Sequence, residues 1–414
     1  MSRSRSVDVP VVKKPSLLII FLSVFIDLIG FGIVLPLLPK YSERFGAHGY
    51  QIGLIISSFS IMQFFFVPWW GRLSDRIGRR PVILISNASS AVSYALFGVA
   101  SLFSGTTGLV LLLASRVFAG MSGSTVAVAS AYIADITPPE KRSKGMGLIG
   151  MAFGLGFIFG PAIGGLSAAK LGLAGPGWIA AGLCAFNFVL GSCILVESLK
   201  PNSEPATPRP KLEQWVHTFQ LPKVGLLISI FFLATFCFTC FESTLPLLLD
   251  KQFHYDERHV GFLFAYCGLV GAMIQGGAIG RLVKKFGEAQ LIFGSLIIVA
   301  VSMAMIPFTH HLGGLLIALA LFSAGSGIAR APTMGLISIH TPASEQGATL
   351  GVAQSAGTVA RIFGPVFATG LYAVRTPLPY VICAVVALGA SLIAWQYLCR
   401  NALSIPAGKA EHVA

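Results

Sequence analysis

Five charged side chains stand inside long apolar stretches of this 414-residue sequence: Asp27, Arg116, Glu242, Arg330 and Arg361. A charge in such a stretch is costly and is usually kept for a function. A carboxyl group there can take up and release a proton, whereas an arginine stays charged and needs an anion beside it. The eight histidines fall in loops, tails or the edges of the stretches, so a proton-carrying group in this chain must be a carboxylate.

Asp27 is the first candidate for that group, because it is the only acid in the middle of an apolar stretch in the first half of the chain. Burial favours its neutral form, and Arg116, expected at a similar depth, would favour its charged form. The alternative is a static Asp–Arg pair. Glu242 is the second candidate, although it is expected nearer the outer surface. Three buried arginines against two such acids also suggest an anionic ligand, which makes Arg330 and Arg361 candidate cavity residues.

A charged loop is expected at residues 71–80, which lie between two uncharged apolar flanks and read GRLSDRIGRR. Glycines permit the tight turns of a very short connection. Asp75 could accept hydrogen bonds from backbone N–H groups at a helix N-terminus, and Arg76 could reach an acid, for which Asp135 is the expected partner. The alternative is that the arginines only fix orientation in the membrane. The candidate residues are Gly71, Asp75, Arg76, Gly78, Arg79, Arg80 and Asp135.

Glycines recur at every fourth position at Gly156, Gly160 and Gly164. Small residues at this spacing let two helices approach closely, and Pro161 removes a backbone donor and favours a bend. Close packing and a pliable helix beside a gate are both compatible with the pattern. Polar residues that could line a cavity within the apolar stretches are Gln63, Tyr132, Gln275 and Gln354.

The elements that must position these residues are membrane-spanning helices. Only 11% of the residues are charged and 55% are hydrophobic, whereas soluble domains carry about 25% charged residues. Stretches of about 20 apolar residues, enough to cross a bilayer as a helix, recur along nearly the whole chain. No cleavable signal peptide is expected. We expect an all-α membrane protein with twelve spans, at 16–39, 51–71, 82–103, 108–134, 145–169, 177–197, 223–249, 258–280, 289–308, 312–338, 348–373 and 378–398.

The lysines and arginines divide unevenly between the two expected sides of the membrane. Of the 29, 20 fall on the side of both termini, 6 on the opposite side and 3 within spans. Positive residues favour the cytoplasmic side, so both termini are expected in the cytoplasm. The net charge of +13 is then a signal of topology, and no nucleic-acid partner is expected.

Residues 198–222 form the longest polar stretch and contain five prolines, as a linker does. Within it, LEQWVHTF could form a short amphipathic helix on the membrane surface. The linker follows the sixth expected span. The expected organisation is therefore a tail at 1–15, a six-helix half at 16–197, the linker at 198–222, a second six-helix half at 223–398 and a tail at 399–414.

The two expected halves repeat each other. GRLSDRIG at 71–78 aligns with GRLVKKFG at 280–287, LPLLP at 35–39 with LPLLL at 245–249, and FGP at 159–161 with FGP at 363–365. Matches in the same order at a nearly constant offset predict two pseudo-symmetric halves with a pathway between them.

These motifs resemble the major facilitator superfamily over about residues 16–398. The charged loop resembles the signature loop between helices two and three, RVFAGMSGS from Arg116 resembles the fourth-helix motif of proton-coupled members, and DLIGFGIVLPLLP at 27–39 resembles the first helix of drug:proton antiporters, most of all tetracycline exporters. The resemblance implies that the charged loop bridges to the other half and closes the cytoplasmic side. The segment 156–165 resembles the fifth-helix motif of antiporters, with Gly156, Gly160, Pro161, Gly164 and Gly165.

The chain departs from the tetracycline exporters at three places. Gly271 stands where they carry a histidine in the eighth helix, and Ser93 stands where they carry an aspartate in the third. Their ninth helix holds an aspartate, whereas the only acid here is Glu288, just outside the expected span. Those groups serve a polar, metal-chelated drug, so an antiporter of this type is expected to take other substrates.

The leading interpretation is a transporter that exports small lipophilic or amphiphilic compounds in exchange for protons, acting as a monomer in a bacterial inner membrane. The alternative is a proton-coupled transporter of one small metabolite, for which an anion is a candidate. A receptor or scaffold is a third class, against which the charged loop and the two buried carboxylates argue. We find no metal cluster, phosphate-binding loop or nucleophile–base spacing, so we expect no enzyme, metal or cofactor. The C-x-x-C at Cys237 and Cys240 is interpreted as two small residues in a helix, outside any disulfide framework.

Overall fold

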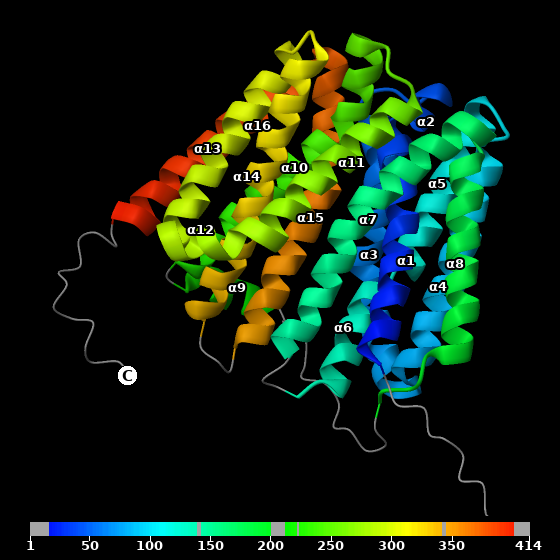
Figure 1. Cartoon of the computed structure of the whole chain (residues 1–414), viewed down its shortest axis with the longest axis horizontal. Helices are drawn as coiled ribbons and strands as arrows, with labels where there is room; N and C mark the ends of the chain where they lie inside the picture. Colours follow the sequence, from blue (N-terminus) through cyan, green and yellow to red (C-terminus); the bar gives the residue numbers. More distant parts are fainter. Residues whose placement is uncertain (1–15, 139–141, 200–211, 222, 342–344, 401–414) are drawn as a thin grey trace, which may run out of the picture.

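The computed structural model describes residues 16–138, 142–199, 212–221, 223–341 and 345–400, and within these the chain is helical without strands. Twelve segments are long and apolar enough to cross a membrane, as expected (Figure 1). The chain is thus an integral multi-pass membrane protein. The expected tail at 1–15, all but the first two residues of the expected tail at 399–414, and residues 200–211 and 222 of the expected linker lie outside the described residues.

The first six spans run from Leu17 to Ile194. A 3-10 turn within the first span and a break at Gly123 and Ser124 in the fourth divide these two spans into shorter helices. The helices are α1 (Leu17–Val34), η1 (Leu35–Leu37), α2 (Leu38–Arg44), α3 (Tyr50–Ile77), α4 (Arg79–Ala100), α5 (Gly105–Ser122), α6 (Thr125–Ile136), α7 (Arg142–Leu171) and α8 (Gly175–Ile194).

The last six spans run from Val224 to Arg400 and follow a short helix in the linker, α9 (Leu212–Gln220), at the position of the expected amphipathic segment. The helices of these spans are α10 (Val224–Phe253), α11 (Glu257–Met273), η3 (Ile274–Ala278), α12 (Ile279–Phe286), α13 (Glu288–Met305), η4 (Ile306–Phe308), α14 (Leu312–Ile339), α15 (Gln346–Val374), α16 (Leu378–Ala394) and η5 (Trp395–Arg400).

The eighth span is longer than expected and is interrupted by a π-helical turn. The sequence suggests one helix over 258–280, whereas the span runs from Glu257 to Phe286 with η3 in its middle. Gly276 and Gly277 lie in this turn, and glycine is a poor helix former. Turns of this type inside a helix often mark a functional position.

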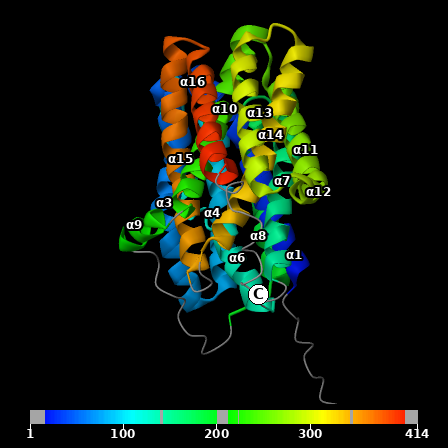
Figure 2. The ribbon, with the colours of Figure 1, turned by 90° about the vertical axis from the view of Figure 1, so that its left-hand side faces the viewer.

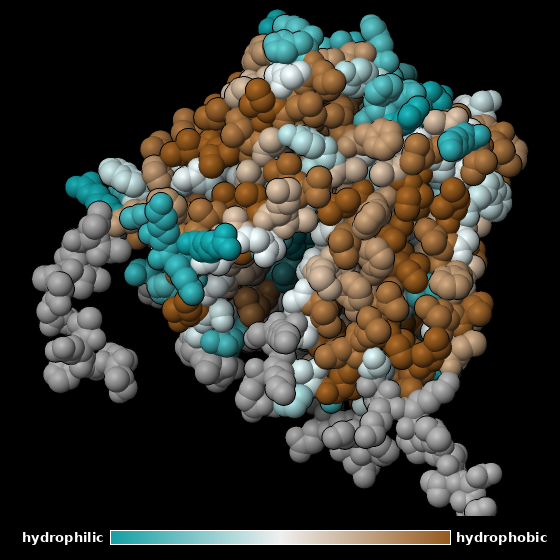
Figure 3. Space-filling view, in the orientation of Figure 1, coloured by the Kyte–Doolittle hydropathy of each residue, from teal (hydrophilic) through white to brown (hydrophobic). Residues whose placement is uncertain are grey.

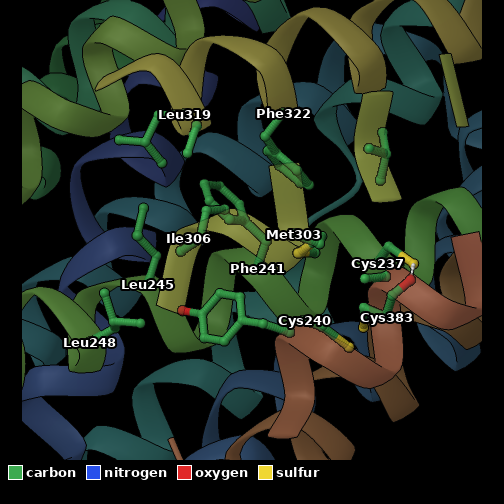
Figure 4. Packing of buried hydrophobic residues seen from close by; sticks show 14 of the residues in the cluster. Cys237, Cys240, Phe241, Leu245, Leu248, Met303, Ile306, Leu319, Phe322 and Cys383 are labelled. Atoms are coloured by element: carbon green, nitrogen blue, oxygen red, sulfur yellow. Dashed lines mark hydrogen bonds between the residues drawn. The ribbon is translucent and has the colours of Figure 1, made fainter. Parts of the chain in front are cut away.

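The helices gather into two groups, α1–α8, coloured from blue to green, and α10–α16, coloured from green through yellow to red (Figures 1 and 2). Each group encloses its own apolar core. In the second half, the centroids of the Phe241 and Phe322 rings lie 3.9 Å apart, with the rings tilted by 31° (Figure 4). The thiols of Cys237 and Cys240 are buried in the same cluster, beside Cys383 of α16. Cys237 and Cys240 are thus small residues packed in an apolar cluster, which agrees with the interpretation of the C-x-x-C.

We call the end of the bundle at which α1 begins and η5 ends the termini face, and the opposite end, at which α2 ends, the far face. The halves touch mainly along two helix pairs, α3 with α15 and α7 with α11, and α2 and η1 also contact the second half. These contacts include residues near the far-face ends of the helices, such as Gly53 of α3 and Gly165 of α7. Toward the termini face the space-filling view shows a hollow between the halves with hydrophilic side chains inside it (Figure 3). The pathway is therefore closed at the far face and open toward the termini face.

Candidate functional site

Ion pairs between the two halves close the far face. Lys40 of the first half is buried, and its Nζ lies 2.7 Å from Asp250 Oδ1 and 3.8 Å from Glu257 Oε1 of the second. The same nitrogen donates to the carbonyl oxygen of Tyr255 at 2.9 Å. Arg44 adds a pair with Glu257 at 3.0 Å. We call Lys40, Arg44, Asp250 and Glu257 the far-face network.

A neighbouring acid adds to the negative charge facing Lys40. Asp256 caps the N-terminus of α11 by accepting from the backbone N–H of His259 at 3.0 Å. Partial burial works against its ionisation, but the N–H and ring of His259, with Lys40 nearby, hold the pKa of Asp256 below its ordinary value. The carboxylate therefore stays charged at neutral pH.

Small residues allow the close helix contacts behind this network. A Cβ atom on Gly53 would lie 2.5 Å from the carbonyl oxygen of Pro365, and one on Gly165 would lie 3.0 Å from the Cα of Arg258. A Cβ on Gly268 would lie 2.6 Å from the carbonyl oxygen of Phe157. Any larger residue at these positions would push the two halves apart.

The other glycines of the fifth-helix motif pack inside the first half. A Cβ on Gly160 would lie 2.7 Å from the Cα of Gly32, and Gly156 and Gly164 meet Leu28 and Ile33 of α1 in the same way. Close packing is thus the role that their contacts support, and Gly165 alone of the four faces the other half. Pro161 lies inside the helix, and its carbonyl oxygen meets Gly261 of α11.

The charged loop is held by acids of its own half. Arg79, not Arg76, pairs with Asp135, with 3.1 Å between Nε and Oδ2, and Arg79 also binds Asp75. The expectation that Arg76 pairs with Asp135 is therefore wrong. Arg79, the first residue of α4, is buried and reaches Asp135, whereas Arg76 is exposed. Gly71 lies within α3 rather than at a turn.

Glu197, which sequence reasoning missed, takes the capping role expected of Asp75. Its carboxylate accepts from the backbone N–H groups of Arg79 and Arg80 at 2.8 and 3.1 Å, at the N-terminus of α4. Gly78 has φ +103°, and a Cβ there would collide with this carboxylate. Arg80 in turn donates to the carbonyl oxygen of Ser192 at 2.8 Å. Among the described residues, these contacts all lie within the first half.

Asp27 lies midway along the first span, next to the hydroxyl groups of Ser90 and Thr125. No ion pair joins it to Arg116 within the described parts of the chain, so the expected opposition between the two is not a direct pair. Hydroxyl groups can hydrogen-bond either the charged or the neutral carboxyl. The carboxyl group is thus held in place without a fixed countercharge.

Arg116 is almost completely buried, with 2% of its surface exposed. Its guanidinium lies 5.6 Å from the ring centre of Tyr94 and 5.5 Å from that of Phe97. Its Nε approaches Ser115 Oγ at 3.4 Å, and its Nη2 has no hydrogen-bond partner among the described residues. Aromatic faces stabilise this cation in place of an acid.

The second half brings three charged side chains together, from α10, α14 and α15. Arg361 lies within electrostatic range of both Glu242 and Arg330. Its Nη2 donates to Thr358 Oγ1 at 3.4 Å, and Glu242 Oε1 is buried without a hydrogen-bond partner in the part of the chain described. The two arginines and one carboxylate form what we call the Arg–Arg–Glu cluster.

The four polar residues that were expected to line a cavity differ in their exposure. Gln275 and Gln354 are exposed in the second half, as a cavity position requires. Gln63 is half-buried and donates to the carbonyl oxygen of Gly123 at 3.1 Å. Tyr132 is fully buried in an apolar cluster and its hydroxyl donates to the carbonyl oxygen of Val196, so its assignment to a cavity was wrong. The Tyr132 ring packs against the apolar side chains of this cluster.

Two positions in the sequence repeat could have revealed the far-face network. Lys40 directly follows LPLLP in the first half, and Asp250 directly follows LPLLL in the second. Equivalent positions of two pseudo-symmetric halves lie close together where they are near the axis that relates the halves, so opposite charges at such positions can form a pair. No comparable signal marks Glu197, which is the last residue of the sixth expected span and has no counterpart among the repeated motifs.

Comparison with known proteins agrees with this architecture. The family model described as Major Facilitator Superfamily matches residues 20–365 and 276–411. The tetracycline resistance protein of class C from Escherichia coli is 30% identical over 86% of this chain and 90% of its own length. The major facilitator superfamily domain-containing protein 10 of Mus musculus is 26% identical over 94% of each chain.

Solved structures share the fold. The human organic anion transporter MFSD10 (TETRAN) is 25% identical, with a TM-score of 0.69 over 91% of this chain and 98% of that one. A POT family transporter in complex with 5-aminolevulinic acid is only 13% identical but has a TM-score of 0.75 over 92% of this chain and 95% of that one. The chain therefore belongs to the major facilitator superfamily of membrane transporters.

Proposed function

We propose that this transporter exports small lipophilic or amphiphilic compounds in exchange for protons, by alternating access between its two halves. The observation that carries the proposal is Asp27, a carboxyl group at mid-span that is held by hydroxyl groups and lacks an ion-pair partner among the described residues. Such a group can bind either a proton or a substrate, and exchange requires that the two exclude each other. The relatives among tetracycline resistance proteins support export.

We further propose that the termini face is cytoplasmic and that the protein works as a monomer in a bacterial inner membrane. The excess of lysine and arginine on the side of the termini supports the orientation. The Escherichia coli relatives support the location. In that orientation the conformation described is open to the cytoplasm, ready to receive a compound for export.

The cycle then requires two changes. The far-face network must open to release the compound, and the termini face must close, for which the charged loop at 71–80 is the candidate device. In the cytoplasm-open state Arg76 is exposed and so remains available for a partner in the other half. Protonation of Asp27 from the outside would favour the return to the state described.

A second candidate function is the transport of an organic anion coupled to protons. The Arg–Arg–Glu cluster supports it, because two arginines share one carboxylate in the middle of the spans. The relative whose structure is described as a human organic anion transporter points the same way.

The test is transport in everted membrane vesicles carrying a proton gradient. Asp27→Asn should abolish gradient-driven accumulation of fluorescent dyes while the purified variant stays monodisperse and unfolds at the wild-type temperature. Glu43→Gln, which changes an exposed acid at the end of the same span, should transport as the wild type does. Full gradient-driven transport by correctly inserted Asp27→Asn would refute the assignment of Asp27.

A further inference from the structure

We infer that the Arg–Arg–Glu cluster is a binding site for the acidic group of a substrate, a carboxylate or sulfonate, held between Arg330 and Arg361. This inference rests on the proposed role of the chain as a transporter of amphiphilic small molecules and names the charge that one class of them carries. It also gives Glu242 a role, as the group whose charge opposes the binding of that anion.

The charge balance of the cluster is the first argument. Arg361 lies within electrostatic range of Arg330 and of Glu242, so two positive charges face one negative charge. No ion pair joins any of the three in the residues described, and the Arg361 guanidinium donates a hydrogen bond to the neutral hydroxyl of Thr358. With Glu242 ionised the cluster keeps one uncompensated positive charge.

The position of Arg361 is the second argument. It lies one helical turn from Pro365 of α15, whose carbonyl oxygen meets Gly53 of α3 in the first half. Side chains four residues apart share one face of a helix. Arg361 therefore lies between the contact with the first half at Pro365 and Gly357, where a Cβ would lie 2.9 Å from the Phe231 ring of α10. From the contact at Pro365 it is displaced toward the termini face, where the hollow opens (Figure 3).

Arg330 reaches the same region from α14. It is exposed although nine residues of helix separate it from the end of its span at Ile339. One turn earlier, Gly327 faces α11 and η3, where a Cβ would lie 3.7 Å from Gln275 Nε2. An arginine that faced lipid at this depth would be strongly unfavourable, whereas one that lines a water-filled hollow is not.

The chemistry of the guanidinium group defines the ligand. Arginine binds a planar or tetrahedral acid through two parallel hydrogen bonds, and such charge-assisted bonds are the strong ones. Gln275, whose amide nitrogen lies near Gly327 one turn from Arg330, offers a neutral donor beside the cluster. A ligand that brings one negative charge would leave the cluster neutral while Glu242 stays ionised.

The experiment compares two dyes that share one ring system. The sulfonate 8-anilinonaphthalene-1-sulfonate and the uncharged N-phenyl-1-naphthylamine are titrated into the full-length protein in lipid nanodiscs, and the signal of empty nanodiscs is subtracted. Arg330→Gln and Arg361→Gln should each weaken the sulfonate by about tenfold or more, since a hydrogen bond to a charged group contributes about 1.5–3 kcal/mol. The uncharged dye should bind these variants within about twofold of the wild type.

Three further variants sharpen the result. Glu242→Gln removes the competing charge and should tighten the sulfonate several-fold. Arg361→Lys keeps the charge without the two-pronged geometry and should weaken it less than Arg361→Gln does, which also preserves the test if the glutamine variant fails to fold. Arg375→Gln is the matched control, because Arg375 is exposed at the end of the same helix, and it should change neither dye.

Each outcome decides the inference. If the arginine variants weaken both dyes equally, they act through the shape of the cavity and the anion site is wrong. Unchanged sulfonate binding, or an equal loss in Arg375→Gln, overturns it as well. Selective loss of the sulfonate with no gradient-driven export of either dye from proteoliposomes would leave the site standing and refute the proposed exchange mechanism instead.

Discussion

Breaking the far-face network at Lys40 should shift the transporter toward a state open at that face. Lys40 and Asp250 belong to different halves, so their 2.7 Å contact exists only while the far face is closed. The Tyr255 carbonyl, 2.9 Å from the same Nζ, also lies in the second half. Lys40→Met removes both contacts and keeps the apolar part of the side chain.

The size of the shift follows from the burial of the two partners. Removing one member of a fully buried pair costs about 3–5 kcal/mol. Lys40 is buried, but the Asp250 side chain is 49% exposed and can be hydrated once Lys40 is gone. We therefore expect about 2 kcal/mol, which corresponds to about a thirtyfold change in the ratio of far-face-closed to far-face-open molecules.

Hydrogen–deuterium exchange of the protein in nanodiscs measures this ratio without introduced labels. Peptides that cover the start of α3, near Gly53, and the end of α15, near Pro365, should exchange faster in Lys40→Met because these two segments seal the far face. Peptides at the termini-face ends of α6 and α7 should exchange more slowly, because that end closes as the far face opens.

A matched control and a charge exchange test the reasoning. Lys251→Met removes a lysine next to Asp250 whose Nζ donates to Thr376 Oγ1 at 3.1 Å, inside the second half, and should leave the exchange pattern unchanged. Lys40→Asp combined with Asp250→Lys should restore much of the wild-type protection. Unaltered exchange in Lys40→Met, or the same change in Lys251→Met, would refute the idea that these ion pairs bias the equilibrium.

Two further predictions concern the stability of the first half, measured by thermal unfolding in detergent. Arg79→Ala leaves Asp135 and Asp75 without their cation and should lower the free energy of unfolding by about 2–4 kcal/mol. Arg76→Ala, at an exposed position, is the control and should leave the unfolding temperature unchanged. Equal effects of the two variants would contradict the assignment of Arg79 as the buried partner. Gly160→Ala places a methyl group 2.7 Å from the Cα of Gly32 and should lower the free energy of unfolding by about 1–3 kcal/mol through overpacking. Gly150→Ala on the same helix, where a Cβ has nothing within 4 Å, is the control and should not destabilise the protein. A stable Gly160→Ala variant would show that α1 and α7 can separate freely.

The sequence predicts the fold well because the bilayer restricts the choice. Each span must be an apolar helix of about 20 residues, so the run of hydropathy alone locates all twelve. The repeat then predicts the two halves. The backbone at Gly78 and Gly287 shows that the two copies of the charged loop are also alike in structure. These glycines occupy equivalent positions, and their φ angles are +103° and +76°, so both copies of the loop turn in the same unusual way.

The partners of the charged residues are harder to predict. Hydropathy places Arg76 and Arg79 in the same loop, but only the direction in which α4 begins decides which of them enters the bundle and meets Asp135. Asp27 and Arg116 were expected at similar depth, yet aromatic rings surround the arginine and hydroxyl groups surround the acid. Depth along a helix is a property of the sequence, whereas the face on which a side chain points depends on how the helices rotate against one another.

The two copies of the charged loop differ in the acids that pair with their cations and cap the helix that follows. Asp75 and Arg79 bind each other in the first copy, whereas Lys284 stands at the position of Asp75 in the second. Glu197 covers the N-terminus of α4 from another segment, while the equivalent helix α13 begins with an acid of its own, Glu288. The first copy is thus fixed by acids from its own half, and the second is a cationic helix end that follows the π-helical turn η3.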